Sequence, residues 1–117
     1  MASYWHFTEE KELKNKLKEI EEKFSDIAVI EAEFIVKNHG AFVKIENIED
    51  AKKILLHNTI VILGKKQLKG YEEALEKLDF SQGVFVTAES KTADIEKKLI
   101  SGVHGAKECH FVVIQSI

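Results

Sequence analysis

The segment Thr59-Ile60-Val61-Ile62-Leu63-Gly64 is a continuous apolar run that is closed by a glycine. A strand with one solvated face would alternate apolar and polar residues, and this run has no polar residue after Thr59. It therefore predicts a strand that is buried on both faces, as in a parallel sheet. Residues 109–114 are again nearly all apolar and predict a second strand of the same kind.

The order of elements around this strand indicates the fold class. From Asn47 onward, helical and strand patterns alternate. Helices are predicted at residues 47–57, 70–78 and 92–100, and strands at 59–63, 83–88 and 109–114. Such alternation implies right-handed crossovers, so the expected fold is α/β, a mostly parallel sheet with helices on both faces.

Ligands of such sheets bind outside the carboxyl ends of the strands. Three polar segments should gather there: Gly64-Lys65-Lys66, Glu89-Ser90-Lys91-Thr92 and the turn Asn38-His39-Gly40.

The first 24 residues predict an arm followed by an amphipathic helix. Apolar residues recur at helical spacing over residues 8–24, namely Leu13, Leu17, Ile20 and Phe24. This helix either packs on its own sheet or contacts a partner. Ahead of it, Trp5 and Phe7 either staple the helix or anchor a subunit contact.

Residues 27–45 predict an N-terminal β-hairpin. Small and apolar side chains would share one face of a strand over residues 27–36, namely Ala28, Ile30, Ala32, Phe34 and Val36. Glu31-Ala32-Glu33 could alternatively be a turn of helix. Residues 37–40 are a turn candidate, and 41–45 would be the returning strand. In the following helix, Asn47 is the expected N-cap, with Ala51, Ile54 and Leu55 facing inward.

Composition restricts the class of protein. A chain of 117 residues is one domain, 1–117, of which 1–25 are the arm and helix. Its net charge of −3 gives no reason to expect nucleic acid binding. No apolar run approaches the roughly 20 residues that span a membrane, and the N-terminus lacks a signal peptide pattern. A lone cysteine, Cys109, fits a reducing cytoplasm.

The stretch most suited to a ligand follows the apolar run at residues 84–86. Ser90-Lys91-Thr92 precedes a helical pattern, so it lies where unpaired backbone amides and the helix dipole favour an anion. The Ser90 and Thr92 hydroxyls could bind a carboxylate or phosphate, with Lys91 adding charge. Alternatively, one of the hydroxyls only caps the helix.

Two residues nearby could take part in catalysis. Glu96 could act as a base or nucleophile, or could only favour the helix dipole. His104, between two glycines, could transfer protons or hydrogen-bond within its own loop. A metal shared by His104, Cys109 and His110 is not expected, because adjacent strand residues point to opposite faces. Without a Cys-x2-Cys pair, no iron–sulfur cluster is expected on this chain alone.

The segment 90–96, Ser-Lys-Thr-Ala-Asp-Ile-Glu, is followed by Gly102-Val103-His104-Gly105 and an apolar strand. This pattern resembles the C-terminal signature of the lactate-utilisation (LUD) domain family, in particular its LutC-type members, and the similarity extends thinly upstream to about Asp26. The resemblance implies a fold like that of the NagB/RpiA/CoA-transferase group. It also implies a role in the oxidation of L-lactate to pyruvate, as an accessory or ligand-binding component.

The same resemblance implies which residues form one wall of a ligand site and which partner proteins are expected. The expected ligand-binding residues are Ser90, Lys91, Thr92, Gly102, His104 and Gly105. Iron–sulfur partner proteins are expected to carry the electrons, so no cofactor is expected in this chain. The ligand would be a small carboxylate or phosphate.

The chain also departs from the family pattern. LUD domains are typically longer, with an N-terminal portion that supplies more of the sheet, whereas here only a helix is expected before Ile27. The usual Glu-Thr-Gly-Thr stretch appears as Asn38-His39-Gly40-Ala41, and Ala106 replaces a proline. Two alternatives therefore stay open: a non-catalytic small-molecule or anion-binding domain, and a homodimeric assembly module whose second copy completes the sheet.

Overall fold

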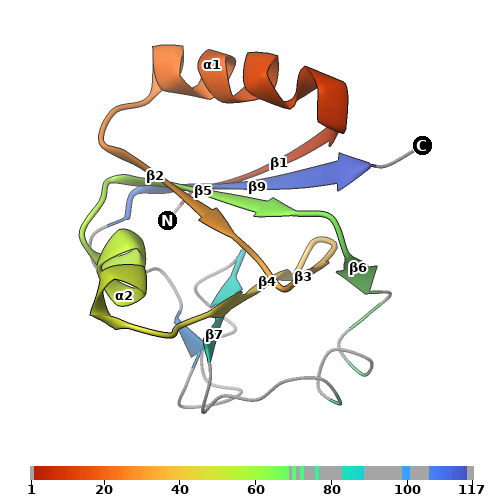
Figure 1. Ribbon diagram of the computed structural model, residues 1–117, viewed down its shortest axis with the longest axis vertical. Coiled ribbons are helices and arrows are strands. Elements are labelled where there is room, and N and C mark those ends of the chain that lie inside the picture. The colour runs from red at the N-terminus through yellow and green to blue at the C-terminus, as the bar shows by residue number, and fades with distance from the viewer. Residues whose placement is uncertain are drawn as a thin grey trace.

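The computed structural model describes residues 2–68, 70, 72, 76, 83–88, 99–100 and 106–115. These residues form a four-stranded parallel sheet and a five-stranded mixed sheet (Figure 1). The parallel sheet has the order β1 (Ala2–Glu9), β9 (Glu108–Gln115), β5 (Thr59–Gly64), β2 (Ile27–Glu31). The mixed sheet has the order β6 (Gln67–Leu68), β3 (Phe34–Val36), β4 (Gly40–Lys44), β7 (Gly83–Thr87), β8 (Leu99–Ile100). The helical elements are η1 (Glu10–Glu12), α1 (Leu13–Lys23) and α2 (Ile48–Leu55).

The central strands β5 and β9 are buried on both faces, as predicted. Successive side chains of a strand point to opposite faces. Ile60 and Ile62 of β5 therefore join the core between the two sheets, whereas Val61 joins the core beneath α1. In β9, Phe111 likewise joins the core between the two sheets, and Val112 joins the core beneath α1. The two strands thus separate two hydrophobic layers.

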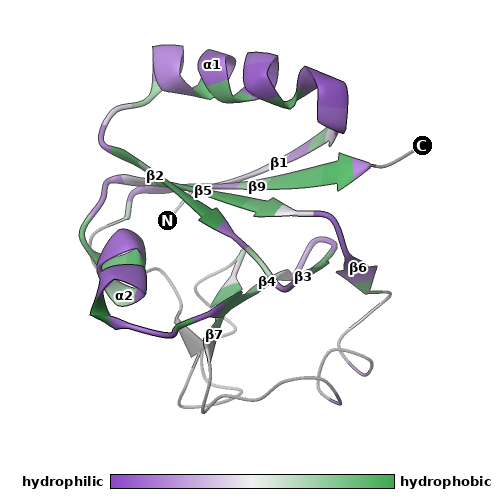
Figure 2. Ribbon diagram, viewed as in Figure 1, coloured by the Kyte–Doolittle hydropathy of each residue, from purple (hydrophilic) through white to green (hydrophobic). Residues whose placement is uncertain are grey.

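Helix α1 covers one face of the parallel sheet (Figure 1). Its apolar side faces the strands and its charged side faces outward (Figure 2). Ile20 is buried against Val61, Val112 and Ile114, and the other predicted apolar residues of this helical segment pack around it, namely Leu13, Leu17 and Phe24. The prediction that this helix packs on its own sheet is confirmed.

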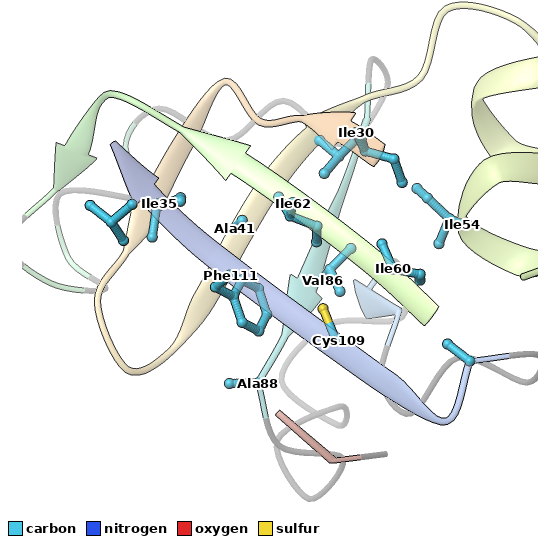
Figure 3. Close-up of a cluster of buried hydrophobic side chains, with 13 residues drawn as sticks. Ile30, Ile35, Ala41, Ile54, Ile60, Ile62, Val86, Ala88, Cys109 and Phe111 are labelled. Carbon is cyan, nitrogen blue, oxygen red and sulfur yellow. The ribbon is translucent and has the colours of Figure 1, made fainter. Parts of the chain in front are cut away.

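The second core lies between the two sheets (Figure 3). Ile62 and Phe111 from the parallel sheet meet Ala41 and Val86 from the mixed sheet. Helix α2 contributes Ile54, which is fully buried.

Helix α2 begins as predicted but buries a narrower stripe. The Asn47 side chain accepts a hydrogen bond from the Asp50 backbone N–H at 3.0 Å, so the N-cap is confirmed. Ala51 is half-buried. Leu55, which was expected to face inward, is 41% exposed. This prediction was wrong because an eight-residue helix beside the sheet edge presents little more than Ile54 to the core.

Residues 2–9 form a strand and not an arm, which corrects the expectation that only a helix precedes Ile27. β1 pairs parallel with β9 over its whole length. The Trp5 ring stacks on Phe111 with centroids 4.5 Å apart, so Trp5 packs in the core of its own chain. Phe7 is 43% exposed and lies beneath the Lys37 ammonium, 5.2 Å from the ring centroid. The strand was missed because polar residues occur on both of its faces.

The predicted strand over residues 27–36 is divided between the two sheets. The Ala32 N–H still donates to Leu63 O of the parallel sheet at 2.7 Å, and the next N–H, of Glu33, donates to Phe42 O of the mixed sheet at 2.8 Å. The chain therefore changes sheets between two consecutive residues, and the alternative of a helical turn here was wrong.

The predicted hairpin is present as β3 and β4, which pair antiparallel around the turn at residues 37–39. Asn38 has a φ of 66°, in the left-handed region that asparagine tolerates. At Gly40 the backbone passes so close to β7 that any side chain would collide with the Val86 carbonyl. Glycine is therefore required where this hairpin returns.

The single mostly parallel sheet is corrected to two sheets. β7, which was expected in the same mostly parallel sheet as β5 and β9, pairs antiparallel with β4 instead. α1 covers one face of the parallel sheet, and the mixed sheet covers most of the other. Residues 99–100, predicted as a helix end, form β8 beside β7. Residues 92–98 and most of the helix predicted at 70–78 lie outside the described residues.

Substitution of the central aromatic residue tests this two-layer core. Phe111→Ala should lower the free energy of unfolding by about 3–5 kcal/mol, because it leaves a cavity between the sheets and removes the ring beneath Trp5. Urea titration followed by circular dichroism measures this change. The exposed Phe7→Ala is the matched control and should cost about 1 kcal/mol or less. Equal losses in both variants would contradict the assigned core.

Candidate functional site

The carboxyl ends of β2, β5 and β9 border a pocket of about 400 Å³. Its lining residues are Glu10, Leu13, Glu31, Ala32, Glu33, Leu63, Gly64, Lys65, Lys66 and Ile114. The pocket lies where ligands of parallel sheets bind, and Gly64-Lys65-Lys66 is located at this end, as predicted. Its volume is in the range of small-molecule sites.

Two strands and a helix build the apolar part of the pocket. Leu63 ends β5, Ile114 lies near the end of β9, and Leu13 begins α1 above them. A Cβ at Gly64 would overlap the end of the Ile35 side chain, so a larger residue where β5 leaves toward the mixed sheet would force that buried side chain to move. The apolar side chains thus form a wall against which a methyl group or short hydrocarbon could pack.

Charged side chains of both signs surround this apolar wall. The Lys65 ammonium lies 2.9 Å from the Glu10 carboxylate, and the hydrogen bond and charge of Glu10 raise the pKa of Lys65. Lys66 is exposed and forms no ion pair in the part of the chain that the structure describes. Glu31 and Glu33 line the pocket as well. The rim therefore offers one uncommitted ammonium and two carboxylates, which suits a small ligand bearing a carboxylate and a hydrogen-bond donor.

A histidine pair beneath α1 was not predicted from the sequence. The parallel pairing of β1 with β9 brings His6 Nε2 to 2.8 Å from His110 Nδ1. The His110 side chain is 1% exposed, stacked on Tyr4 and met edge-on by Phe24. The pair could not be found before β1 was known, because its members are 104 residues apart.

Burial controls the ionisation of both rings. It lowers the pKa of His110 to about 4, and the charge of His6 acts in the same direction. Burial also lowers the pKa of His6, assisted by Lys16 and opposed by Glu19. Among the described residues, His110 Nε2 finds no hydrogen-bond partner. Two neutral rings in an aromatic enclosure are a packing feature of the sheet rather than an acid–base centre open to substrate.

The residues predicted from the family pattern lie outside the described residues. They are Ser90, Lys91, Thr92, Glu96, Gly102, His104 and Gly105. The preceding strand β7 ends at Thr87, and the Ala88 N–H donates to the His39 carbonyl at 2.7 Å. The Ser3 hydroxyl donates to the Ala88 carbonyl. The turn at 38–40 therefore lies beside the end of β7 and does not line the pocket with Gly64-Lys65-Lys66.

Within the described ranges, no three His, Cys, Asp or Glu side chains converge as metal ligands. Cys109 lies between the sheets and His110 beneath α1, so the two point to opposite faces as predicted. Burial raises the pKa of the Cys109 thiol, which disfavours the thiolate that metals bind. One buried thiol does not fit an iron–sulfur cluster. No helix in the described part of the chain is long and apolar enough to cross a membrane.

The histidine pair predicts a pH dependence of stability. The unfolded chain takes up protons near pH 6.5, whereas folded His110 takes them up only near 4, so between these values stability falls as the pH falls. His110→Phe should remove most of this dependence. The free energy of unfolding of the variant minus that of the wild type should therefore be roughly 1–3 kcal/mol larger at pH 4.5 than at pH 7. Urea titrations at several pH values measure the difference, and parallel curves for the two proteins would refute the assignment.

The model of the LUD domain family matches residues 4–114. The match begins within β1, upstream of Asp26, where the resemblance in the sequence was expected to begin. No curated protein sequence and no solved structure matches the chain. Because the family match includes both sheets and the pocket at the ends of β2, β5 and β9, the chain belongs to the LUD domain family, which is associated with lactate utilisation.

Proposed function

We propose that this protein is a ligand-binding, accessory component of L-lactate utilisation and that L-lactate binds in the pocket at the carboxyl ends of β2, β5 and β9. The observation that supports this proposal is the pocket itself. It joins an apolar wall to a rim on which Lys66 carries a positive charge that is not paired within the described part of the chain. The family association with lactate utilisation supplies the ligand class.

The chemistry of a 2-hydroxy acid matches the three kinds of group that line this pocket. The lactate carboxylate would pair with the Lys66 ammonium in a charge-assisted hydrogen bond. The hydroxyl would donate to the carboxylate of Glu31 or Glu33, both of which accept only. The methyl group would pack on Leu63 and Ile114. One lactate does not fill about 400 Å³, so bridging waters would complete the site.

The acidic side of the rim also selects among carboxylates. Pyruvate has a carbonyl where lactate has a hydroxyl, so it cannot donate to Glu31 or Glu33 and leaves a carboxylate without its partner. Phosphate carries more negative charge toward the same carboxylates. The expected order of affinity is therefore L-lactate, then pyruvate, then phosphate.

The family pattern supports a second contribution to binding. We propose that Ser90, Lys91 and Thr92, with Gly102, His104 and Gly105, provide further ligand contacts, as in LutC-type members. The resemblance also implies a fold of the NagB/RpiA/CoA-transferase type. Glu96 or His104 would be the residue that takes part in catalysis. As the family resemblance implies, iron–sulfur partner proteins would carry the electrons from lactate. Cys109 itself is buried with a raised pKa, which does not fit a cluster ligand.

The lysine on the rim provides the first test. Lys66→Met should weaken L-lactate binding at least tenfold in isothermal titration calorimetry, because it removes the pocket ammonium proposed to pair with the carboxylate. Lys18→Met is the matched control, since Lys18 is exposed on α1 and does not line the pocket. Undiminished binding in Lys66→Met, or equal loss in both variants, would refute this pocket as the lactate site.

A second variant separates the pocket from the family-pattern segment. Thr92→Ala should reduce lactate affinity only a fewfold, since one neutral hydrogen bond contributes about 1 kcal/mol. The same calorimetric titration measures it. If Thr92→Ala abolishes binding while Lys66→Met does not, the ligand binds at the 90–105 segment and the pocket assignment is wrong.

A further inference from the structure

Among the described residues, strand β2 is one of the two edge strands of the parallel sheet. It is last in the strand order and pairs there with β5 alone. Two hydrogen bonds show which of its backbone groups face β5: Ala32 N–H donates to Leu63 O, and Thr59 N–H donates to Asp26 O. Backbone groups of a parallel strand alternate in direction, so residues 26, 28, 30 and 32 bond to β5. The N–H and C=O groups of Val29 and Glu31 therefore point away from the sheet.

These outward groups have no hydrogen-bond partner in the part of the chain that the structure describes. A strand edge with unpaired amides and carbonyls can accept one more strand. The Val29 side chain is 39% exposed at the middle of β2, so apolar surface accompanies the unpaired backbone.

A groove of about 410 Å³ runs along this edge, between β2 and the segment that leads from β4 into α2. Four carboxylates and two ammonium groups line it: Glu31, Glu33, Glu46 and Asp50, with Lys44 and Lys53. The groove therefore carries a net charge of −2 from these side chains. An acidic groove beside an open backbone edge favours a positively charged, extended occupant.

We infer that the β2 edge docks an extended segment of a partner protein rich in lysine or arginine, which adds to the parallel sheet as a fifth strand. Backbone hydrogen bonds to Val29 and Glu31 supply affinity, and the carboxylates select basic side chains. A second copy of this chain fits less well. Antiparallel pairing of two β2 strands would bring the acidic grooves of both copies together, where like charges repel.

This inference does not depend on the lactate pocket. The groove extends along β2 toward α2, whereas the pocket opens at the carboxyl end of the sheet near Lys65 and Lys66. Glu31 and Glu33 border both, so peptide and lactate could influence each other, yet neither requires the other for binding.

A synthetic probe tests the inference directly. An end-capped, fluorescein-labelled octapeptide of alternating lysine and valine should bind the full chain, as measured by fluorescence anisotropy. A glutamate–valine octapeptide should bind at least tenfold more weakly. A lysine–valine octapeptide with N-methylated alternate amides should also lose at least tenfold, because it keeps the charge and lacks the backbone donors. If the N-methylated peptide binds as tightly as the unmethylated lysine–valine octapeptide, charge alone accounts for the interaction and the inference is overturned.

Two kinds of variant locate the binding edge. Val29→Pro removes an N–H that points away from β5, so no hydrogen bond within the sheet is lost. Edge strands tolerate proline at such positions. The variant should weaken lysine–valine binding at least tenfold, with Val29→Thr within twofold of wild type. If circular dichroism shows that Val29→Pro does not fold, a double variant that combines Glu33→Gln and Glu46→Gln replaces it. Both glutamates are exposed. The double variant should weaken binding at least fivefold and reduce its salt dependence.

Two results would overturn the assignment. Undiminished binding in folded Val29→Pro, or in the double glutamine variant, would exclude this edge. A dimer in light scattering that Val29→Pro converts to monomer would assign the edge to a second copy of the chain.

Discussion

Burial of β5 and β9 on both faces is the constraint on which the rest of the structure depends. Their side chains alternate between two hydrophobic layers, so each face needs a separate cover. The amphipathic α1 covers one face, and the mixed sheet, with Ile54 of α2, covers the other. Once both faces are closed, the exposed parts of the parallel sheet are its edges and strand ends. The pocket at the strand ends and the groove beside β2 follow from this arrangement.

The N-terminal strand is the second consequence of the same constraint. β1 pairs with the outer side of β9 and places Trp5 on Phe111 in the core between the sheets. On the other face it places His6 against His110, whose burial holds both rings neutral at physiological pH. Residues 2–9 are therefore part of the folded sheet, in agreement with a family match that begins at residue 4. Among the described residues, β1 and β2 are the two edge strands of the parallel sheet.

Residues whose pattern reflects local burial could be predicted from the sequence, whereas strand pairing could not. The unbroken run at Thr59–Gly64, the stripe of α1 and the Asn47 cap are local signals, and all three are present in the structure. The transfer between sheets at Ala32 and Glu33 depends on bonds to residues 63 and 42, which periodicity does not encode. The predicted position of β7 was wrong for the same reason. Its apolar run would fit either sheet, and only the pairing with β4 decides between them. Of the pocket residues, Gly64-Lys65-Lys66 could be predicted from its place after a strand. That Glu10 and Glu33 line the same pocket could be seen only in the folded structure.

A titration of the ¹⁵N-labelled protein with L-lactate, followed by amide chemical shifts, decides whether the pocket at the ends of β2, β5 and β9 is the proposed lactate site. Binding there should cause saturable shifts that are largest at Ala32, Gly64, Lys65 and Lys66, the backbone that surrounds the pocket. Shifts confined to Thr87, Ala88 and the residues after them, or no shifts at millimolar lactate, would contradict the proposed site.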